Sequence, residues 1–214
     1  MSEAVLYDYW RSSASYRVRI ALNLAGVRYQ SEVIDLVSGQ QRSEVHLALN
    51  PQGLVPALEI DGTVLTQSLA ILDYLAETRA LALLPDDEVM RAKVRALAHC
   101  LAVDVHPVCN LQVVRHVEAL TNDPNAKAAW MKHFIRPGLE AFEALTRDLP
   151  IGDFCVGNQP GLADICLIPQ LYNARRWGVD YSDLGRLAAI DDACLALRAF
   201  GDARPEAVDP ERSL

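Results

Sequence analysis

A cluster of hydroxyl side chains follows the first apolar run of the chain. Ser12, Ser13 and Ser15 lie within four residues, between Arg11 and Arg17. The first N–H groups of a helix have no partner within the helix, and the helix dipole adds about half a positive charge, so an anion is stabilised there. One serine is enough to cap a helix. Three serines beside arginines therefore point to a site for a thiolate or a carboxylate, with capping as the simpler alternative.

The composition argues against several classes of partner. The chain has 214 residues, with 20 Lys and Arg against 28 Asp and Glu and a net charge of −8. This balance disfavours nucleic acid and anionic membranes as main partners. A small anionic substrate would therefore require a local cluster of arginines. No segment reaches the ~18 to 20 apolar residues of a membrane helix, and the first residues lack the pattern of a secretory signal. We expect a cytoplasmic protein with no membrane contact.

The cysteines and histidines are scattered along the chain. None of the five cysteines belongs to a CxxC pair or has the spacing of a zinc site, and the five histidines form no HExxH motif. We therefore expect no metal site. The cysteines are expected to be reduced and mostly buried: Cys100, Cys109, Cys155, Cys166 and Cys194.

The first eighty residues alternate between strand and helix patterns. Apolar residues at i, i+3, i+4 and i+7 predict a helix over 15–24, and Asp61-Gly62 between two short apolar runs predicts a hairpin. The full predicted order is strand 5–9, helix 15–24, strand 29–35, a short helix ending near Leu49, strands 57–60 and 64–66, and helix 68–78. This is mixed α/β structure with one antiparallel pair, in the order of a thioredoxin-like fold.

The second half of the chain has only helical periodicity. After a link at 79–87, helices are predicted over 88–120, 125–148, 162–176 and 187–200. Pro107 is expected to kink the first of them. The last segment, 203–214, has two prolines and little apolar content, which predicts a mobile tail. We thus expect an α/β thioredoxin-like domain at 1–82 and an all-α domain at 88–214.

A thioredoxin-like half with serines where a redox protein carries CxxC, followed by an all-helical half, resembles the glutathione transferase superfamily. Within it, residues 11–22 (RSSASYRVRIAL) are similar to the signature of the zeta class, the maleylacetoacetate isomerases. Ala14 departs from the usual zeta pattern, which has Cys at this position. The resemblance covers essentially the whole chain and implies glutathione as cofactor and a homodimer.

The resemblance places glutathione against the turn formed by Ser12, Ser13, Ala14 and Ser15. It assigns the hydrogen bond to the glutathione thiol to Ser12, with Ser13 as the alternative, while Ser15 is expected to cap the helix. Such a bond and the helix field lower a thiol pKa from ~8.5 toward neutrality. Because the turn has no cysteine, the nucleophile would come from the cofactor.

Further positions match glutathione-binding residues of the family. Val55-Pro56 matches a cis proline, and the main chain of Val55 would pair with the cysteinyl part of glutathione; an ordinary proline at the start of a strand is the alternative. Gln67 and Ser68 match the pair that holds the γ-glutamyl end, with Ser68 as a plain N-cap the alternative. Gln41 matches a loop contact to the tripeptide.

The helical half contributes further candidates by the same resemblance. His106, Asn110 and Gln112 surround the expected kink and match polar side chains that reach the active site, although a lone histidine can equally be structural. Arg176 matches an arginine that, with Arg11, holds substrate carboxylates. The simpler explanation of Arg176 is its position at a helix C-terminus, and the role of Arg175 stays open.

The stretch Gly161-Leu162-Ala163-Asp164 is similar to the helix N-capping box of the family. Most members have Ser or Thr at the position of Gly161. Glycine is a tolerable N-cap, and Asp164 is still expected to accept hydrogen bonds from the N-terminal amides.

The resemblance implies a glutathione-dependent cis-trans isomerase that converts maleylacetoacetate to fumarylacetoacetate, in tyrosine and phenylalanine catabolism, by reversible thiolate addition. Arg11 and Arg176 would hold the small dianionic substrate and help to stabilise the enolate. Maleylpyruvate isomerase is the close alternative, although Leu111 stands where that branch can use an additional arginine. A zeta-like glutathione S-transferase or dehalogenase acting on small electrophiles is another. A non-catalytic binding module with this fold is the weakest, since it would lack the serine cluster and the pair at 67–68.

Overall fold

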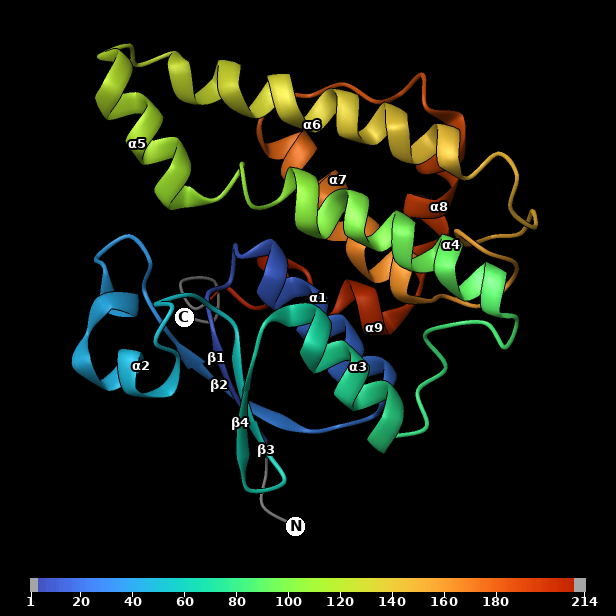
Figure 1. Ribbon diagram of the computed structural model, residues 1–214, viewed down its shortest axis with the longest axis horizontal. Helices are drawn as coiled ribbons and strands as arrows, with labels where there is room; N and C mark the ends of the chain where they lie inside the picture. The colour runs from blue at the N-terminus through green and yellow to red at the C-terminus, as the bar shows by residue number, and fades with distance from the viewer. Residues whose placement is uncertain (1–3, 210–214) are drawn as a thin grey trace. The chain divides into compact units, whose positions relative to one another are not determined.

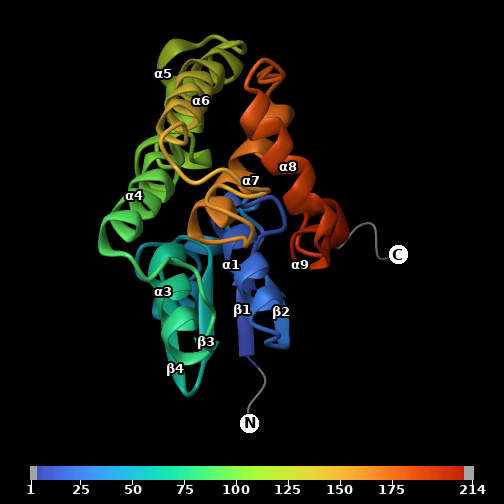
Figure 2. The same cartoon turned by 90° about the vertical axis from the view of Figure 1, so that its right-hand side faces the viewer.

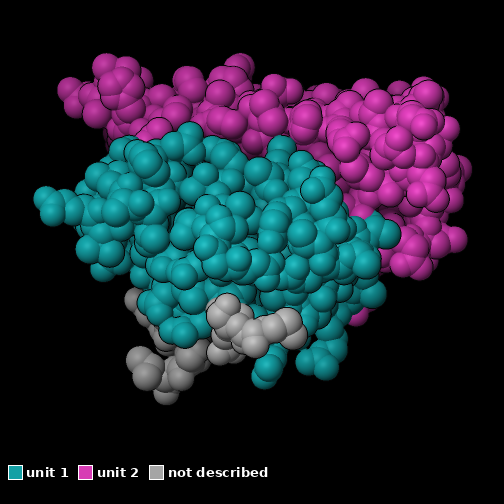
Figure 3. Space-filling model, turned by 60° about the horizontal axis from the view of Figure 1, so that its bottom comes forward, with its two compact units in different colours: residues 1–82, 197–214 teal, residues 83–196 magenta. Residues whose placement is uncertain are grey.

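Residues 4–209, which the computed structural model describes, divide into two units. The first contains the described residues up to Ala82 together with those from Leu197 onward, and the second contains residues 83–196 (Figure 3). The end of the chain thus belongs to the first unit, whereas the sequence predicted a second domain that ran from 88 to 214.

Four strands and several helices make up the first unit. Its elements are β1 Ala4–Asp8, α1 Ser13–Leu24, β2 Tyr29–Val33, the 3-10 turn η1 Gln40–Arg42, α2 Glu44–Leu49, β3 Ala57–Ile60, β4 Thr63–Thr66, α3 Ser68–Thr78, α9 Arg198–Gly201 and the 3-10 turn η3 Pro205–Ala207. The strands form one sheet in the order β2-β1-β3-β4. Helices α1 and α3 cover one face of this sheet, and α2 covers the other (Figure 1, Figure 2).

The strand directions agree with the sequence prediction. β1 and β2 are parallel, with Val5 opposite Gln30, whereas β3 is antiparallel to both β1 and β4. The β3–β4 turn lies at Asp61 and Gly62, whose φ values of 53° and 77° suit a two-residue hairpin. The predicted thioredoxin-like α/β fold is therefore confirmed.

Helix α1 is buried on more than its apolar face. Val18, Ala21 and Leu22 are fully buried, as the periodicity predicted, but Arg17 and Arg19 on the same helix are also buried. The helix contacts α3 as well as α9, so polar residues outside the apolar stripe are enclosed too.

The C-terminal segment, residues 199–209, is held against α1 by hydrogen bonds. Three polar side chains of α1 donate to its main-chain carbonyls: Tyr16 to Phe200, Arg19 to Ala203 and Asn23 to Ala199. Ala203, Pro205 and Asp209 are buried. The prediction of a mobile tail is therefore wrong for residues 203–209, because side chains of another helix satisfy a segment that is poor in apolar residues. Residues 210–214 of the predicted tail lie outside the described part of the chain.

Residues 83–196 contain helices and turns. The helices are α4 Glu88–His99, the π-helix η2 Cys100–Val105, α5 Leu111–Thr121, α6 Ala126–Leu145, α7 Leu162–Arg176 and α8 Gly185–Ala196. Helix α7 is central, since it contacts α4, η2, α6 and α8 and buries 12 of its 15 residues. The predicted all-α character of this half is confirmed. Throughout residues 4–209, each helix is too short or too polar to span a lipid bilayer.

The predicted helix 88–120 is divided rather than kinked at Pro107. Helix α4 continues into η2, turns follow, and α5 begins after Asn110. Proline cannot donate a main-chain hydrogen bond, and Asn110 starts the next helix by accepting from the Gln112 N–H (3.1 Å). Helix α6 packs closely against η2 at Gly138, where a Cβ atom would lie 2.4 Å from Cγ2 of Val105.

The start of α7 has the capping arrangement predicted for Asp164. Its carboxylate accepts hydrogen bonds from the N–H groups of Gly161 (2.8 Å) and Cys155 (2.8 Å). Burial raises the pKa of Asp164. A Cβ at residue 161 would lie 3.0 Å from the Leu83 carbonyl oxygen. The main chain at Leu83 is therefore so close that glycine fits here better than Ser or Thr.

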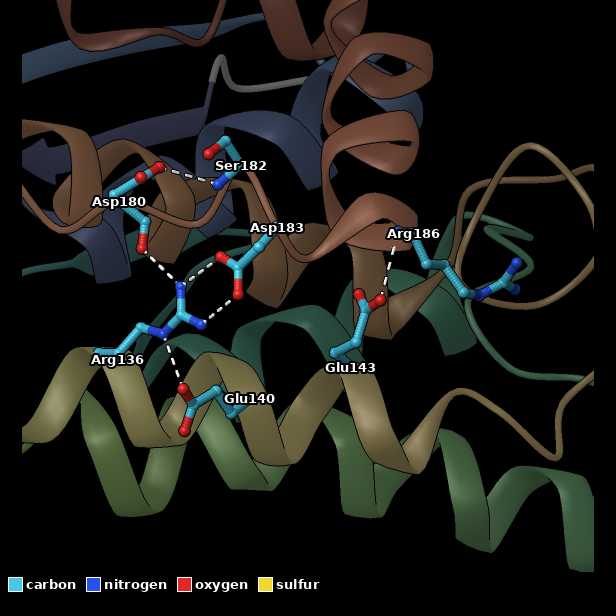
Figure 4. Close-up of polar contacts among 7 residues, drawn as sticks. All are labelled: Arg136, Glu140, Glu143, Asp180, Ser182, Asp183 and Arg186. Atoms are coloured by element: carbon cyan, nitrogen blue, oxygen red, sulfur yellow. Dashed lines mark hydrogen bonds and ion pairs between the residues drawn. The ribbon is translucent and has the colours of Figure 1, made fainter.

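Charged residues of α6 hold the loop before α8 (Figure 4). Arg136 donates to both carboxylate oxygens of Asp183 at 2.7 Å and to Glu140 at 2.8 Å. Glu143 accepts from the N–H groups of Arg186 (3.3 Å) and Leu187 (3.0 Å), at the start of α8. A carboxylate from a neighbouring helix therefore satisfies two of the free amides of α8.

Candidate active site

The serine turn begins α1, and Ser12 is its N-cap. The Ser12 hydroxyl accepts a hydrogen bond from the Ser15 N–H (3.2 Å), and the Ser12 N–H donates to the Tyr9 carbonyl (2.8 Å). A hydroxyl has one proton and two lone pairs, and capping uses only a lone pair. The Ser12 proton can therefore be donated to an anion while the cap is kept.

The structure corrects the prediction that Ser15 caps the helix. The Ser15 side chain is fully buried, and its hydroxyl has no hydrogen-bond partner among the described residues. Its contribution to the turn is the main-chain N–H that Ser12 accepts. Ser13 is 9 % exposed, and Ala14 is half-buried. Of the three hydroxyls, that of Ser12 is the most accessible to a ligand, since Ser13 and Ser15 are both buried.

Arg11 is held in place by the two aromatic residues before it. Its Nη2 donates to the Tyr9 hydroxyl (3.0 Å), and its guanidinium carbon lies 4.3 Å from the Trp10 ring centroid. The buried Nε–H of Arg11 has no hydrogen-bond partner within residues 4–209. Tyr9 and Trp10 thus orient a half-buried guanidinium, whose planar set of N–H donors suits a carboxylate.

Arg19 fixes the main chain that leads into the serine turn, a role the sequence did not reveal. Its Nη1 donates to both carboxylate oxygens of Asp8 (2.8 and 2.7 Å), and its Nη2 donates to the Trp10 carbonyl (2.9 Å). Its Nε donates to the carbonyl of Ala203 (2.9 Å). One buried guanidinium therefore joins the end of β1, the turn and the C-terminal segment.

The Val55-Pro56 peptide bond is cis, as predicted from the resemblance. The preceding carbonyl, that of Leu54, accepts from His46 Nε2 (2.9 Å) and Asn50 Nδ2 (2.9 Å). His46 and Asn50 are each only 2 % exposed. Only a protonated ring nitrogen can donate to a carbonyl, so Nε2 of His46 carries a proton here. These two side chains fix the main chain next to Val55, and the sequence analysis had singled out neither.

Gln67 and Ser68 form the start of α3. Gln67 has a positive φ of 67°, a conformation that is costly for a residue other than glycine, and its Nε2 donates to Gln52 Oε1 (2.7 Å). Ser68 is the first helical residue, and Gln67 holds the N-cap position without a side-chain cap bond. The alternative that Ser68 is a plain N-cap is therefore wrong. Its buried hydroxyl instead accepts from Arg17 Nη1 (3.1 Å).

Gln41 lies in η1, in the loop before α2. Its side chain is half-buried, and its Oε1 is buried without a hydrogen-bond partner in the described part of the chain. An amide oxygen in this position can accept from a ligand N–H.

The candidates of the second unit lie near the break after η2. His106 is half-buried, Gln112 is exposed on α5, and the Oδ1 of Asn110 is used to cap that helix. Trp130 Nε1 on α6 donates to the Val108 carbonyl (2.9 Å) and holds this turn.

The two arginines at the end of α7 differ in their contacts. Arg175 forms an ion pair with Asp191 and a hydrogen bond with the Tyr181 hydroxyl. Burial, together with Asp191, raises the pKa of Tyr181 to about 12. Arg175 therefore serves the packing of α7 against α8. Arg176 is exposed, with its guanidinium carbon 5.4 Å from the Trp177 ring centroid.

Cys109 and Cys155 do not offer an alternative nucleophile. All five cysteines are free thiols. Burial raises the pKa of Cys109 to about 11 and that of Cys155 well above its usual range, so neither is a thiolate near neutral pH. Among residues 4–209, no three His, Cys, Asp or Glu side chains are grouped as metal ligands.

Comparison with known proteins gives the family. Residues 2–77 match the model of the glutathione S-transferase N-terminal domain. The chain is 54 % identical to the maleylacetoacetate isomerase of Rhizobium meliloti (strain 1021), over 98 % of this chain and 99 % of that protein. The chain belongs to the maleylacetoacetate isomerase family of glutathione transferases.

Two solved structures extend this assignment to the zeta class. A holo maleylpyruvate isomerase, described as a bacterial zeta-class glutathione S-transferase, matches with a TM-score of 0.93 and 40 % identity, over 96 % of this chain and 99 % of that chain. A maleylacetoacetate isomerase from Anaeromyxobacter dehalogenans 2CP-1, with glutathione bound in its active site, matches with a TM-score of 0.86 and 42 % identity, over 97 % of each chain. The predicted zeta-class family is therefore confirmed.

Proposed function

We propose that this zeta-class chain is a glutathione-dependent cis-trans isomerase that converts maleylacetoacetate to fumarylacetoacetate. When bound, glutathione supplies a thiolate whose reversible addition allows the substrate double bond to rotate. The observation that carries the proposal is the serine turn, where Ser12 caps α1 and keeps a proton to donate to that thiolate. The chain supplies no thiolate of its own in this turn.

The polar groups of the first unit fit glutathione chemically. The Ser12 hydroxyl suits the thiol, with Ser13 as the alternative donor, and the fixed main chain of Val55 suits the cysteinyl part. Gln67 and Ser68, at the start of α3, suit the γ-glutamyl carboxylate. The half-buried amide side chain of Gln41, in the loop before α2, suits a peptide group of glutathione.

The arginines are the proposed substrate ligands. Arg11 is held by Tyr9 and Trp10, so its guanidinium can bind a carboxylate with little loss of side-chain freedom. Arg176 is proposed to bind the other carboxylate of the dianionic substrate. His106, Asn110 and Gln112 are proposed contacts to glutathione from the second unit.

Maleylpyruvate isomerase is the second candidate function. It is supported by the TM-score of 0.93 to a solved maleylpyruvate isomerase. Leu111, the first residue of α5, provides no charge for a carboxylate. A zeta-like transferase or dehalogenase that acts on uncharged electrophiles would lose little activity when Arg176 is replaced by alanine.

The proposal includes a cytoplasmic homodimer, which rests on the family alone. Light scattering coupled to size-exclusion chromatography tests it: a mass near twice 23.6 kDa is expected, and a mass near 23.6 kDa would contradict it.

The function is tested by following isomerisation of maleylacetoacetate and of maleylpyruvate, each with and without glutathione. We expect glutathione-dependent turnover that is faster with maleylacetoacetate, and a loss of about 10- to 100-fold in kcat/KM for Arg176→Ala. Activity on neither substrate, or activity that does not need glutathione, would rule the isomerase out.

A further inference from the structure

Arg17 is a buried arginine whose place on α1 does not mark it as functional. Only 2 % of the residue is exposed, and its Nη1 donates to the Ser68 hydroxyl at 3.1 Å. Ser68 is 6 % exposed and is the first residue of α3. A guanidinium removed from water is costly unless its surroundings compensate the charge, so its presence beside a helix start requires a physical reason.

We propose that Arg17 is a positioning residue for the γ-glutamyl carboxylate of glutathione, acting through Ser68. This inference rests on the proposed glutathione site. A guanidinium can only donate, so its bond to Ser68 occupies a lone pair of the hydroxyl and leaves the hydroxyl proton to be donated. The proton is then directed to an anionic acceptor, and a hydrogen bond from a cation to the hydroxyl strengthens the one that the hydroxyl makes.

The position of Ser68 within α3 supports this role of Arg17. A serine at a helix start normally caps the helix with its oxygen, but here Gln67 holds the N-cap position and Ser68 lies inside the helix. The hydroxyl is therefore not used by its own helix. The charge of Arg17 adds to the field of the α3 N-terminus, and both favour a carboxylate at this place.

The position of Arg17 in the chain links the two ends of the cofactor site. Ser12 caps α1 and is the proposed donor to the thiol, and Arg17 follows five residues later on the same helix. One helix would thus activate the thiol at its start and, through Ser68, anchor the far end of the tripeptide.

The test compares two ligands by isothermal titration calorimetry. One is glutathione, and the other is 4-aminobutanoyl-cysteinylglycine, which differs only by lacking the γ-glutamyl carboxylate. For Arg17→Met we expect glutathione to bind about 10- to 100-fold more weakly, while binding of the analogue changes less than about twofold. Arg17→Lys keeps the charge but not the planar geometry and should fall between. Arg28→Met, at an exposed arginine of the same unit, is the control.

A second set of measurements separates positioning from folding. The losses in Arg17→Met and Ser68→Ala should not add in the double variant, because both remove the same contact. The KM for glutathione should rise while kcat at saturating glutathione stays within about twofold. An equal loss for both ligands, or full additivity, would overturn the proposal. Wild-type protein that binds neither ligand would overturn the glutathione site itself. If Arg17→Met prefers glutathione over the analogue as strongly as wild type does, only the role of Arg17 is overturned.

Discussion

Each unit contains an arginine that binds both oxygens of an aspartate, but the surroundings differ. In the first unit, the Arg19 side chain is 0 % exposed and that of Asp8 is 4 % exposed. In the second unit, the corresponding side-chain exposures of Arg136 and Asp183 are 28 % and 64 %. This second pair is drawn in Figure 4. Arg19 also holds the carbonyls of Trp10 and Ala203, beside the serine turn. The first unit thus uses buried charge to fix the main chain of the candidate site, whereas this second-unit pair stays in contact with water.

The largest loss of stability is expected when the buried Arg19–Asp8 pair is broken. Arg19→Met leaves the Asp8 carboxylate buried without its partner, so we expect the free energy of unfolding to fall by about 3–5 kcal/mol. Chemical denaturation of the purified protein measures this change, with Arg28→Met as the exposed control. A loss below about 1 kcal/mol would mean that Arg19 is not needed to hold β1, the turn and the C-terminal segment together.

Asp164 is a buried aspartate of the second unit, so its replacement tests whether burial or the unit decides how much stability is lost. Asp164→Ala leaves the N–H groups of Cys155 and Gly161 without an acceptor. We expect a loss of about 1.5–3 kcal/mol in unfolding free energy. Asp153→Ala, at an exposed aspartate of the preceding loop, should cost far less. Equal losses of unfolding free energy in Asp164→Ala and Asp153→Ala would show that burial does not decide how much these aspartates stabilise the fold.

The contact of His46 with the Leu54 carbonyl tests a buried side chain that forms no ion pair in the described structure. His46→Leu removes one of the two donors to this carbonyl, and Asn50 retains the other. We expect glutathione to bind about fivefold more weakly, with kcat at saturation unchanged. Calorimetry measures the affinity, and His116→Leu on α5 is the exposed control. Unaltered affinity would show that the main chain next to Val55 does not depend on His46.

The smallest effect is expected at Arg136. The hydrogen bond from Arg136 lowers the pKa of Asp183, so this pair stabilises the fold above the ordinary aspartate pKa, and the contribution is lost as pH falls through the lowered value. Thermal unfolding of Arg136→Met should therefore give a slightly lower Tm than wild type at pH 7, and this difference should disappear once the pH is below the lowered pKa of Asp183. A fall in Tm as large as that of Arg19→Met, measured by the same thermal unfolding at pH 7, would contradict the comparison between the two pairs.

The sequence predicted the elements that depend on local pattern. The Asp61-Gly62 turn, the strands beside it and the apolar face of α1 follow from short-range chemistry. The cis bond at Pro56 came from the resemblance, since a proline before a strand does not by itself specify the isomer.

Several of the errors share a physical cause, which is contact between residues far apart in the chain. Arg17 and Arg19 carry no sign of burial, because burial depends on Ser68, Asp8 and a segment nearly two hundred residues away. For the same reason, residues 203–209 were predicted as a tail. At Pro107, the sequence predicted an interruption of the helix but not that π-helical turns and a new cap at Asn110 would divide it.

The assignment of Ser12 as the group that activates the thiol is tested most directly by the pKa of bound glutathione. The absorbance of the thiolate, followed against pH, gives this value for complexes of wild type, Ser12→Ala and Ser13→Ala. We expect a midpoint clearly below the ordinary thiol value of ~8.5 in wild type and Ser13→Ala, and a return to about that value in Ser12→Ala. A midpoint that Ser12→Ala leaves unchanged would contradict the assignment.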